Sequence, residues 1–180
     1  MKKHIISAIT AAILLSSCHK PDPSKYVSTA FINANMLHGF AGRMLNDEMT
    51  GIVQNKKNGT ARFTCTEFIR QQTDAATAAL VKISELPETA EAAAMLDASK
   101  ALFSFAVDVY NKEYRELALL YDQEADSATT NTKARLIQQR YEERFSQLYN
   151  QLGEAGMAYA AKNNIRITNV QTSPGASGAK

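Results

Sequence analysis

The hydrophobic positions of this 180-residue chain recur at intervals of three and four residues over most of its length. This spacing places apolar side chains on one face of an α-helix, whereas a half-buried strand would need strict alternation. Four such stretches follow one another, at about residues 24–56, 60–84, 87–126 and 133–163. The pattern predicts an all-α protein with four long amphipathic helices.

Short polar segments separate these stretches. Residues 58–60 (Asn-Gly-Thr) can form a turn, and Pro87 is accepted in the first turn of a helix but disfavoured inside one. Residues 127–132 are rich in side chains that hydrogen-bond their own backbone, which is typical of a turn and a cap. Because long helices joined by short turns run antiparallel, we predict an up-down-up-down four-helix bundle over residues 26–163.

Glycine pairs suggest how the first and last helices cross. Gly39 and Gly42 lie in the first half of the first predicted helix, and Gly153 and Gly156 lie in the second half of the last. Antiparallel packing would bring both pairs to similar heights. A close crossing there would offset the cost of glycine inside a helix, which is up to about 1 kcal/mol. The alternative is that Gly156 merely loosens or kinks the last helix.

The first 18 residues follow a different pattern. Two lysines precede an apolar run at residues 5–15, which is about half of the roughly 20 residues that a membrane span needs. This is the organisation of a signal peptide. Residues 15–18, Leu-Ser-Ser-Cys, resemble the lipobox of bacterial lipoproteins, in which the cysteine is acylated and the chain is cut before it. The resemblance implies that residues 1–17 are removed and that Cys18 carries lipid, while the alternative is an ordinary secretory peptide.

The lipoprotein resemblance also implies a location. Several acyl chains anchor a protein effectively permanently, so the partner of Cys18 would be the lipid bilayer of the bacterial cell envelope. In some Gram-negative lipoproteins an aspartate after the cysteine retains the protein at the inner membrane. His19 occupies that position here, which favours the outer membrane, facing the periplasm or the cell surface. Residues 18–25 would form a short tether with two prolines, and residues 164–180 a flexible tail.

Charge and cysteine content narrow the function. Removal of the signal would take away two lysines, leaving 18 basic and 18 acidic residues and no net charge. We therefore expect no nucleic-acid partner. Cys65 would be left without a cysteine partner, so we expect no disulfide and interpret Cys65 as a small core residue.

Catalytic and cofactor motifs are missing from the sequence. Di-iron bundles use Glu-x-x-His, which does not occur, and only His19 and His38 would remain after signal removal. Cys65 as a nucleophile would need a nearby base and a lowered pKa. We predict a protein that is not an enzyme and holds no cofactor. A haem bound through His38 is the alternative, without a motif to support it.

Aromatic residues repeat at intervals of three, four or seven in the last two predicted helices. We call the following set the tyrosine seam: Tyr110, Tyr114, Tyr121, Tyr141, Phe145 and Tyr149. Ordinary core packing with hydroxyls at the rim is the simpler interpretation, and a pocket or partner groove is the other. We predict a non-catalytic interaction module that presents a helix face to an envelope protein. The alternative is a carrier or sensor holding a small apolar ligand or haem at the seam.

Overall fold

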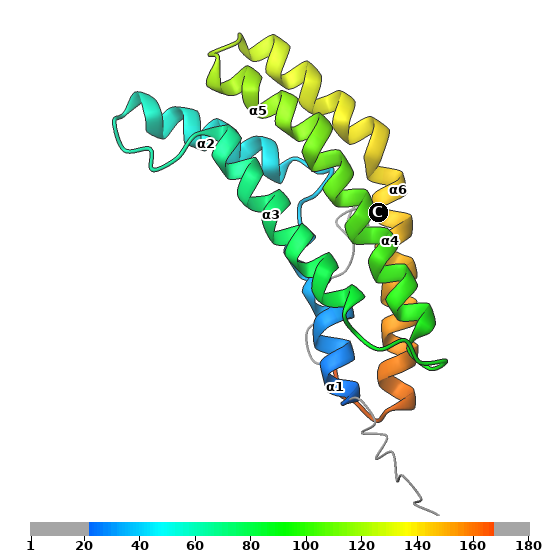
Figure 1. The fold of residues 1–180 in the computed structure, drawn as a ribbon. Helices are drawn as coiled ribbons and strands as arrows, with labels where there is room; N and C mark the ends of the chain where they lie inside the picture. Colours follow the sequence, from blue (N-terminus) through cyan, green and yellow to red (C-terminus); the bar gives the residue numbers. More distant parts are fainter. Residues whose placement is uncertain (1–21, 168–180) are drawn as a thin grey trace, which may run out of the picture.

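The computed structural model describes residues 22–167, and these residues form helices and connecting turns without a strand (Figure 1). This confirms the predicted all-α class. The helices are α1 (Pro23–Tyr26), the π-helical η1 (Val27–Phe31), the 3-10 helix η2 (Ile32–Leu37), α2 (Met44–Lys57), α3 (Cys65–Ser84), α4 (Ala93–Val109), the π-helical η3 (Tyr110–Tyr114), α5 (Arg115–Asp122) and α6 (Ser127–Lys162). Cys18, the signal segment and residues 168–180 of the predicted tail lie outside the described residues.

The helices pack along one another around a common apolar core. α3 packs against α4, and α4 packs in turn against α6. The segment η1 contacts α6, α4 and α3, whereas α2 contacts α5 and α3 at the other end of the molecule (Figure 1). α1 and the last turns of α6 lie at one end, where the rings of Tyr26 and Tyr159 are 5.9 Å apart. None of the helices within residues 22–167 is long and apolar enough to cross a membrane.

The first predicted helix is not continuous, so that prediction is wrong. The chain leaves helical geometry at residues 38–43, where Gly39 has a φ of +84° and Ala41 a φ of +54°. Phe40 and Ala41 are 1% and 0% exposed, and Phe40 lies 4.7 Å from the ring of Phe145. Phe40 does not belong to the apolar stripe of the first predicted helix. The break turns it into the core, and this burial favours the divided conformation.

The starts of α3 and α6 are set by side chains that cap them. α3 begins five residues later than predicted, because Thr64 and Glu67 form a capping box at its N-terminus. α6 begins six residues earlier than predicted, at Ser127, because Asp126 accepts a hydrogen bond from the Thr129 N–H. The polar residues 127–132 therefore form the first turns of α6 rather than a turn between helices.

The third predicted helix, residues 87–126, is wrong at both ends, because the chain is helical only from Ala93 to Asp122. Pro87 lies in the connection before α4 rather than in its first turn, and the Thr89 hydroxyl accepts a hydrogen bond from the Ala92 N–H there. The helical segment also changes geometry midway. The π-helical turn η3 lies between α4 and α5 and contains two members of the tyrosine seam. A π-helical turn accommodates an extra residue and shifts the following side chains around the helix axis, and such turns are frequent at functional sites.

The prediction that glycines of the first and last helices pack against each other is wrong, because the residue opposite Gly156 is not a glycine. Gly156 on α6 packs against Phe31 of η1, where a Cβ atom would lie 2.5 Å from the Phe31 ring. Gly153 faces open space, and Gly39 lies in the turn beside Met44. A close crossing therefore exists between α6 and the N-terminal part of the chain, but a phenylalanine forms its other side.

Candidate functional site

The structure buries most of the tyrosine seam. Tyr110, Tyr114 and Phe145 are at most 2% exposed, Tyr121 is 9% exposed, and Tyr141 and Tyr149 are half-buried. These residues do not form one continuous stack. Instead three of them gather around a residue from outside the seam.

Phe40 is the centre of this aromatic cluster. Its ring centroid lies 5.1 Å from that of Tyr110, 5.8 Å from that of Tyr114 and 4.7 Å from that of Phe145. Sequence reasoning missed Phe40 because it lies off the helical stripe. The available signal was an aromatic residue between Gly39 and Gly42, since two glycines so close together indicate a turn.

The Tyr114 hydroxyl forms a hydrogen bond with the non-helical turn at residues 38–43. It accepts a hydrogen bond from the backbone N–H of Ala41 at 3.0 Å, and this contact is buried. Burial raises the pKa of Tyr114, and the hydrogen bond from Ala41 acts in the opposite direction. The hydroxyl stays protonated and satisfies a backbone group that lies outside any helix.

Three further side-chain hydroxyls bond the same part of the chain. Tyr121 donates to Asn46 Oδ1 at 2.8 Å, and Tyr149 donates to Asn35 Oδ1 at 3.2 Å. Ser99, which is fully buried on α4, donates to the carbonyl of Ala30 at 2.7 Å. These bonds connect α4, α5 and α6 to residues 30–46. The seam is thus largely occupied by contacts within the chain.

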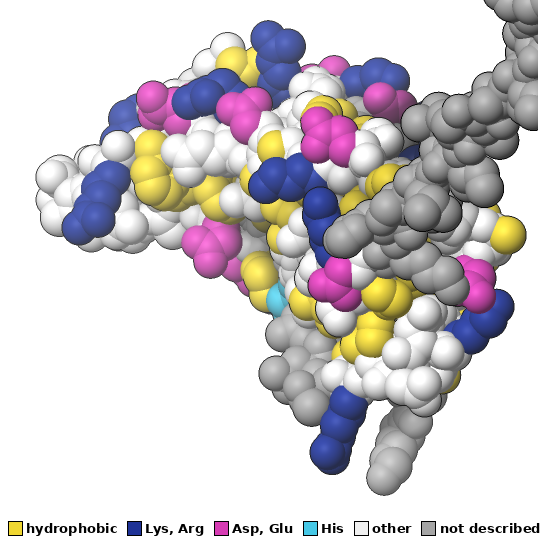
Figure 2. All heavy atoms as spheres, turned by 60° about the horizontal axis from the view of Figure 1, so that its bottom comes forward, with side chains coloured by type: hydrophobic (Ala, Val, Ile, Leu, Met, Phe, Trp, Pro, Cys, Tyr) yellow, Lys and Arg dark blue, Asp and Glu magenta, His cyan; other side chains and the backbone are white. Residues whose placement is uncertain are grey.

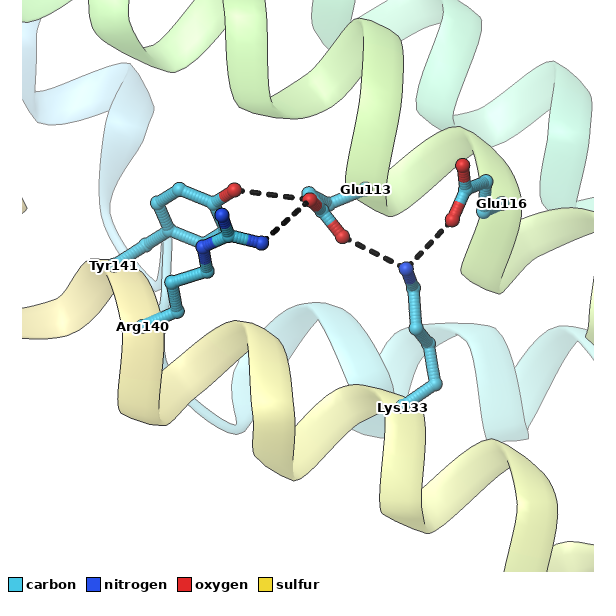
Figure 3. Close-up of polar contacts among 5 residues, drawn as sticks. All are labelled: Glu113, Glu116, Lys133, Arg140 and Tyr141. Carbon is cyan, nitrogen blue, oxygen red and sulfur yellow. Dashed lines mark hydrogen bonds and ion pairs between the residues drawn. The ribbon is translucent and has the colours of Figure 1, made fainter.

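A polar network joins η3 and α5 to α6 at the edge of the seam (Figure 3). Lys133 Nζ lies 2.7 Å from Glu113 Oε2 and 2.6 Å from Glu116 Oε2. The Tyr141 hydroxyl donates to Glu113 Oε1 at 2.9 Å, and Arg140 lies 3.7 Å from the same oxygen. Carboxylate, ammonium and hydroxyl groups are mutually satisfied here, as in a structural ion-pair network.

The network fixes the charge of its two central groups. The hydrogen bond from Lys133 lowers the pKa of Glu113 although partial burial acts against it, and Tyr141 lowers it further. Burial alone would lower the pKa of Lys133, but the hydrogen bonds to Glu113 and Glu116 raise it overall. Both groups are therefore charged at neutral pH, which suits an ion pair rather than a proton-transfer residue.

Cys65 and His38 form no hydrogen bond with a seam residue within residues 22–167. Cys65 is fully buried, and burial together with Asp122 raises the pKa of its thiol to about 12. The thiol is protonated at neutral pH and donates to the Met49 carbonyl at 3.5 Å, so Cys65 is not an activated nucleophile. His38 is exposed in the turn before Gly39. No group of three or more metal-ligating side chains that could hold a metal ion occurs within residues 22–167.

The surface carries both signs of charge. On the face drawn in Figure 2, Lys and Arg side chains alternate with Asp and Glu, and hydrophobic side chains lie between them.

Comparison with known proteins finds no matching family model, no similar curated protein and no similar solved structure. The functional argument therefore depends on the residues of this chain alone.

Proposed function

We propose that this chain is a lipid-anchored lipoprotein of the bacterial cell envelope that works as a non-catalytic binding module. The observation that carries the proposal is the lipobox-like sequence at residues 15–18, directly ahead of a helical domain that begins at Pro23. Cys18 would carry the acyl chains, and His19 favours the outer membrane. The expected partner is an envelope protein.

For the domain itself we propose the finer arrangement of an up-down-up-down four-helix bundle. Its four members would be residues 23–57, α3, the continuous segment 93–122 and α6. The contacts of α3 with α4, of α4 with α6, and of η1 with both α3 and α6 support this arrangement. The division of the first member would be a local departure from the bundle pattern.

The short tether gives the domain an orientation in this proposal. The predicted tether of residues 18–25 ends too late, because Pro23, Ser24 and Lys25 belong to α1, which Asp22 caps. Only residues 19–22 separate Cys18 from α1, and an extended chain of this length reaches about 15 Å. The end of the domain that contains α1 and the last turns of α6 would therefore face the membrane. The opposite end, with the α2–α3 connection and the start of α6, would face a partner (Figure 1).

The side chains give more support to binding than to catalysis. The Cys65 thiol is held protonated, and the charged groups of the Glu113 network are paired with one another. The carrier alternative, with a small apolar ligand or haem at the seam, has less support. The Tyr114, Tyr121 and Tyr149 hydroxyls bond other parts of the chain, and the His38 side chain is exposed.

Fatty-acid labelling tests the anchor. The full-length chain is expressed in a bacterium fed an alkyne-bearing fatty acid, beside Cys18→Ala and the matched variant Cys65→Ala. We expect label and membrane association for the wild type and for Cys65→Ala, and loss of both for Cys18→Ala. Label that persists in Cys18→Ala, or a wild type without label, would contradict the lipoprotein proposal.

Photo-crosslinking of the anchored protein tests the binding role. A photoreactive residue is placed at Phe63, which is 38% exposed near the end proposed to face a partner, or at Met157, which is 48% exposed near the membrane end. We expect a discrete protein adduct from position 63 that is absent from position 157. Equal adducts from both positions, or none from either, would contradict a specific partner at that end.

A further inference from the structure

A solvent-open groove of about 310 Å³ lies between α3 and the junction of η3 with α5. Its α3 side includes Ile69, Arg70 and Asp74, and its other side is formed by Tyr110, Asn111 and Arg115. Pockets for small ligands begin at about this size, and the volume corresponds to roughly ten water-sized groups. The groove is distinct from the Glu113 network, which joins the same helical segment to α6.

Tyr110 places a free hydroxyl in this groove. Its side chain is 2% exposed, and its hydroxyl forms no hydrogen bond with any residue in the range 22–167. Every fully buried side-chain nitrogen or oxygen of the described residues has a partner, so the unpartnered Tyr110 oxygen keeps a small exposed area, and Tyr110 lines this groove. Burial raises the pKa of Tyr110, which keeps the hydroxyl protonated and able to donate.

Arg115 lines the same groove with an exposed side chain. It forms no ion pair with a residue of the described part of the chain. Arg70 is paired with Asp74 at 3.0 Å, so its charge is already balanced. The lining as a whole carries one positive charge, which matches one carboxylate better than a doubly charged phosphate. A guanidinium binds a carboxylate with two parallel hydrogen bonds.

The remaining polar groups of the lining are largely engaged. The Thr66 hydroxyl donates to Asp122 at 2.6 Å, and the Thr73 hydroxyl donates to the Ile69 carbonyl at 2.8 Å. Tyr110, Arg115 and the exposed amide of Asn111 are therefore the donors available to an anion. The Ile69 side chain supplies an apolar wall. This combination of a few convergent polar groups and apolar surface is typical of a ligand site.

We propose that this groove binds a small monocarboxylate with an apolar body. The carboxylate lies on the Arg115 guanidinium and accepts a hydrogen bond from the Tyr110 hydroxyl, and the body packs against Ile69. This inference goes beyond the proposed membrane-anchored binding role and does not depend on lipid at Cys18 or on a protein partner.

Titration with 4-fluorobenzoate, followed by fluorine NMR, tests the proposal on the full-length chain in a non-ionic detergent. We expect a saturable change in the ligand signal at millimolar concentrations or below. Arg115→Gln weakens binding about tenfold, because it removes a charge-assisted hydrogen-bond pair. Tyr110→Phe keeps the ring and weakens binding about threefold to tenfold.

Arg135→Gln is the matched control, since Arg135 is exposed on α6 and does not line the groove. It should bind as tightly as the wild type, and circular dichroism of each variant shows whether it is folded. The proposal is overturned by a wild type without saturable binding, or by equal effects of Arg115→Gln and Arg135→Gln. Displacement of the probe by inorganic phosphate at lower concentrations than by benzoate would overturn the carboxylate assignment.

Discussion

The N-terminal segment, residues 23–57, and α6 have similar hydrophobic patterns but different backbones. α6 runs without interruption from Ser127 to Lys162, and its backbone groups bond one another along the helix. The N-terminal segment is divided into four helical pieces with a non-helical turn at residues 38–43. A helical period therefore indicates which side chains are buried, but not whether the backbone between them is continuous.

The divided segment is held by side chains from the rest of the molecule. Tyr114 bonds the N–H of Ala41, and Ser99 bonds the carbonyl of Ala30. These contacts replace some of the backbone hydrogen bonds that a continuous helix would form within itself. Tyr114, Tyr121 and Tyr149 of the tyrosine seam thus hold the N-terminal segment in place. The Tyr141 hydroxyl bonds Glu113 instead, and the Tyr110 hydroxyl bonds no described residue.

The largest expected effect lies where α6 meets the divided segment. Gly156→Ala places a Cβ atom against the Phe31 ring, and such overpacking costs about 1–3 kcal/mol of unfolding free energy. Gly153→Ala is the control on the same helix, because its Cβ meets open space and alanine favours the helix by up to about 1 kcal/mol. Urea unfolding compares the two. Equal effects would mean that α6 and η1 do not cross closely at Gly156.

Ser99→Ala should have a smaller effect. It removes a buried hydrogen bond to the Ala30 carbonyl and should lower the unfolding free energy by about 1 kcal/mol. Ser104→Ala on the same helix is the control, because Ser104 is exposed. A Ser99→Ala protein as stable as Ser104→Ala in urea would show that the divided segment does not need this support.

The smallest effect concerns pH and the Glu113 network. The pKa of Glu113 is lowered in the folded protein, so the network stabilises the fold above the unfolded pKa of glutamate, about 4.3. This stability is lost as the pH falls through the lower folded value. Glu113→Gln should therefore reduce the loss of unfolding free energy at acid pH, by less than about 1 kcal/mol. The control Glu154→Gln, at an exposed position, should lose as much unfolding free energy at acid pH as the wild type.

Local sequence was sufficient for the helical class and for the existence and order of the helices after residue 60, but not for where each begins. Their hydrophobic periods are long, and Pro87 and residues 58–60 separate them. The break at residues 38–43 could not be derived from the period, because the burial of Phe40 depends on rings contributed by distant helices. The π-helical turn at residues 110–114 has no comparable local signal.

The candidate site was predictable as a set of residues but not as a set of contacts. The spacing of the tyrosines indicated that they share a face. It could not show that Lys133 reaches back to Glu113, since that contact depends on the register of α6 against η3. It also could not show which hydroxyls find partners, and this distinguishes Tyr114 from Tyr110.

The unfolding free energies of Tyr114→Phe and Tyr110→Phe test the central claim, that seam hydroxyls hold the divided segment, most directly. Tyr114→Phe leaves the buried Ala41 N–H without a partner and should cost about 1–3 kcal/mol. Tyr110→Phe removes a hydroxyl that bonds no described residue and should change the free energy by less than about 0.5 kcal/mol. Equal losses in the two variants, or no loss in Tyr114→Phe, would contradict the account.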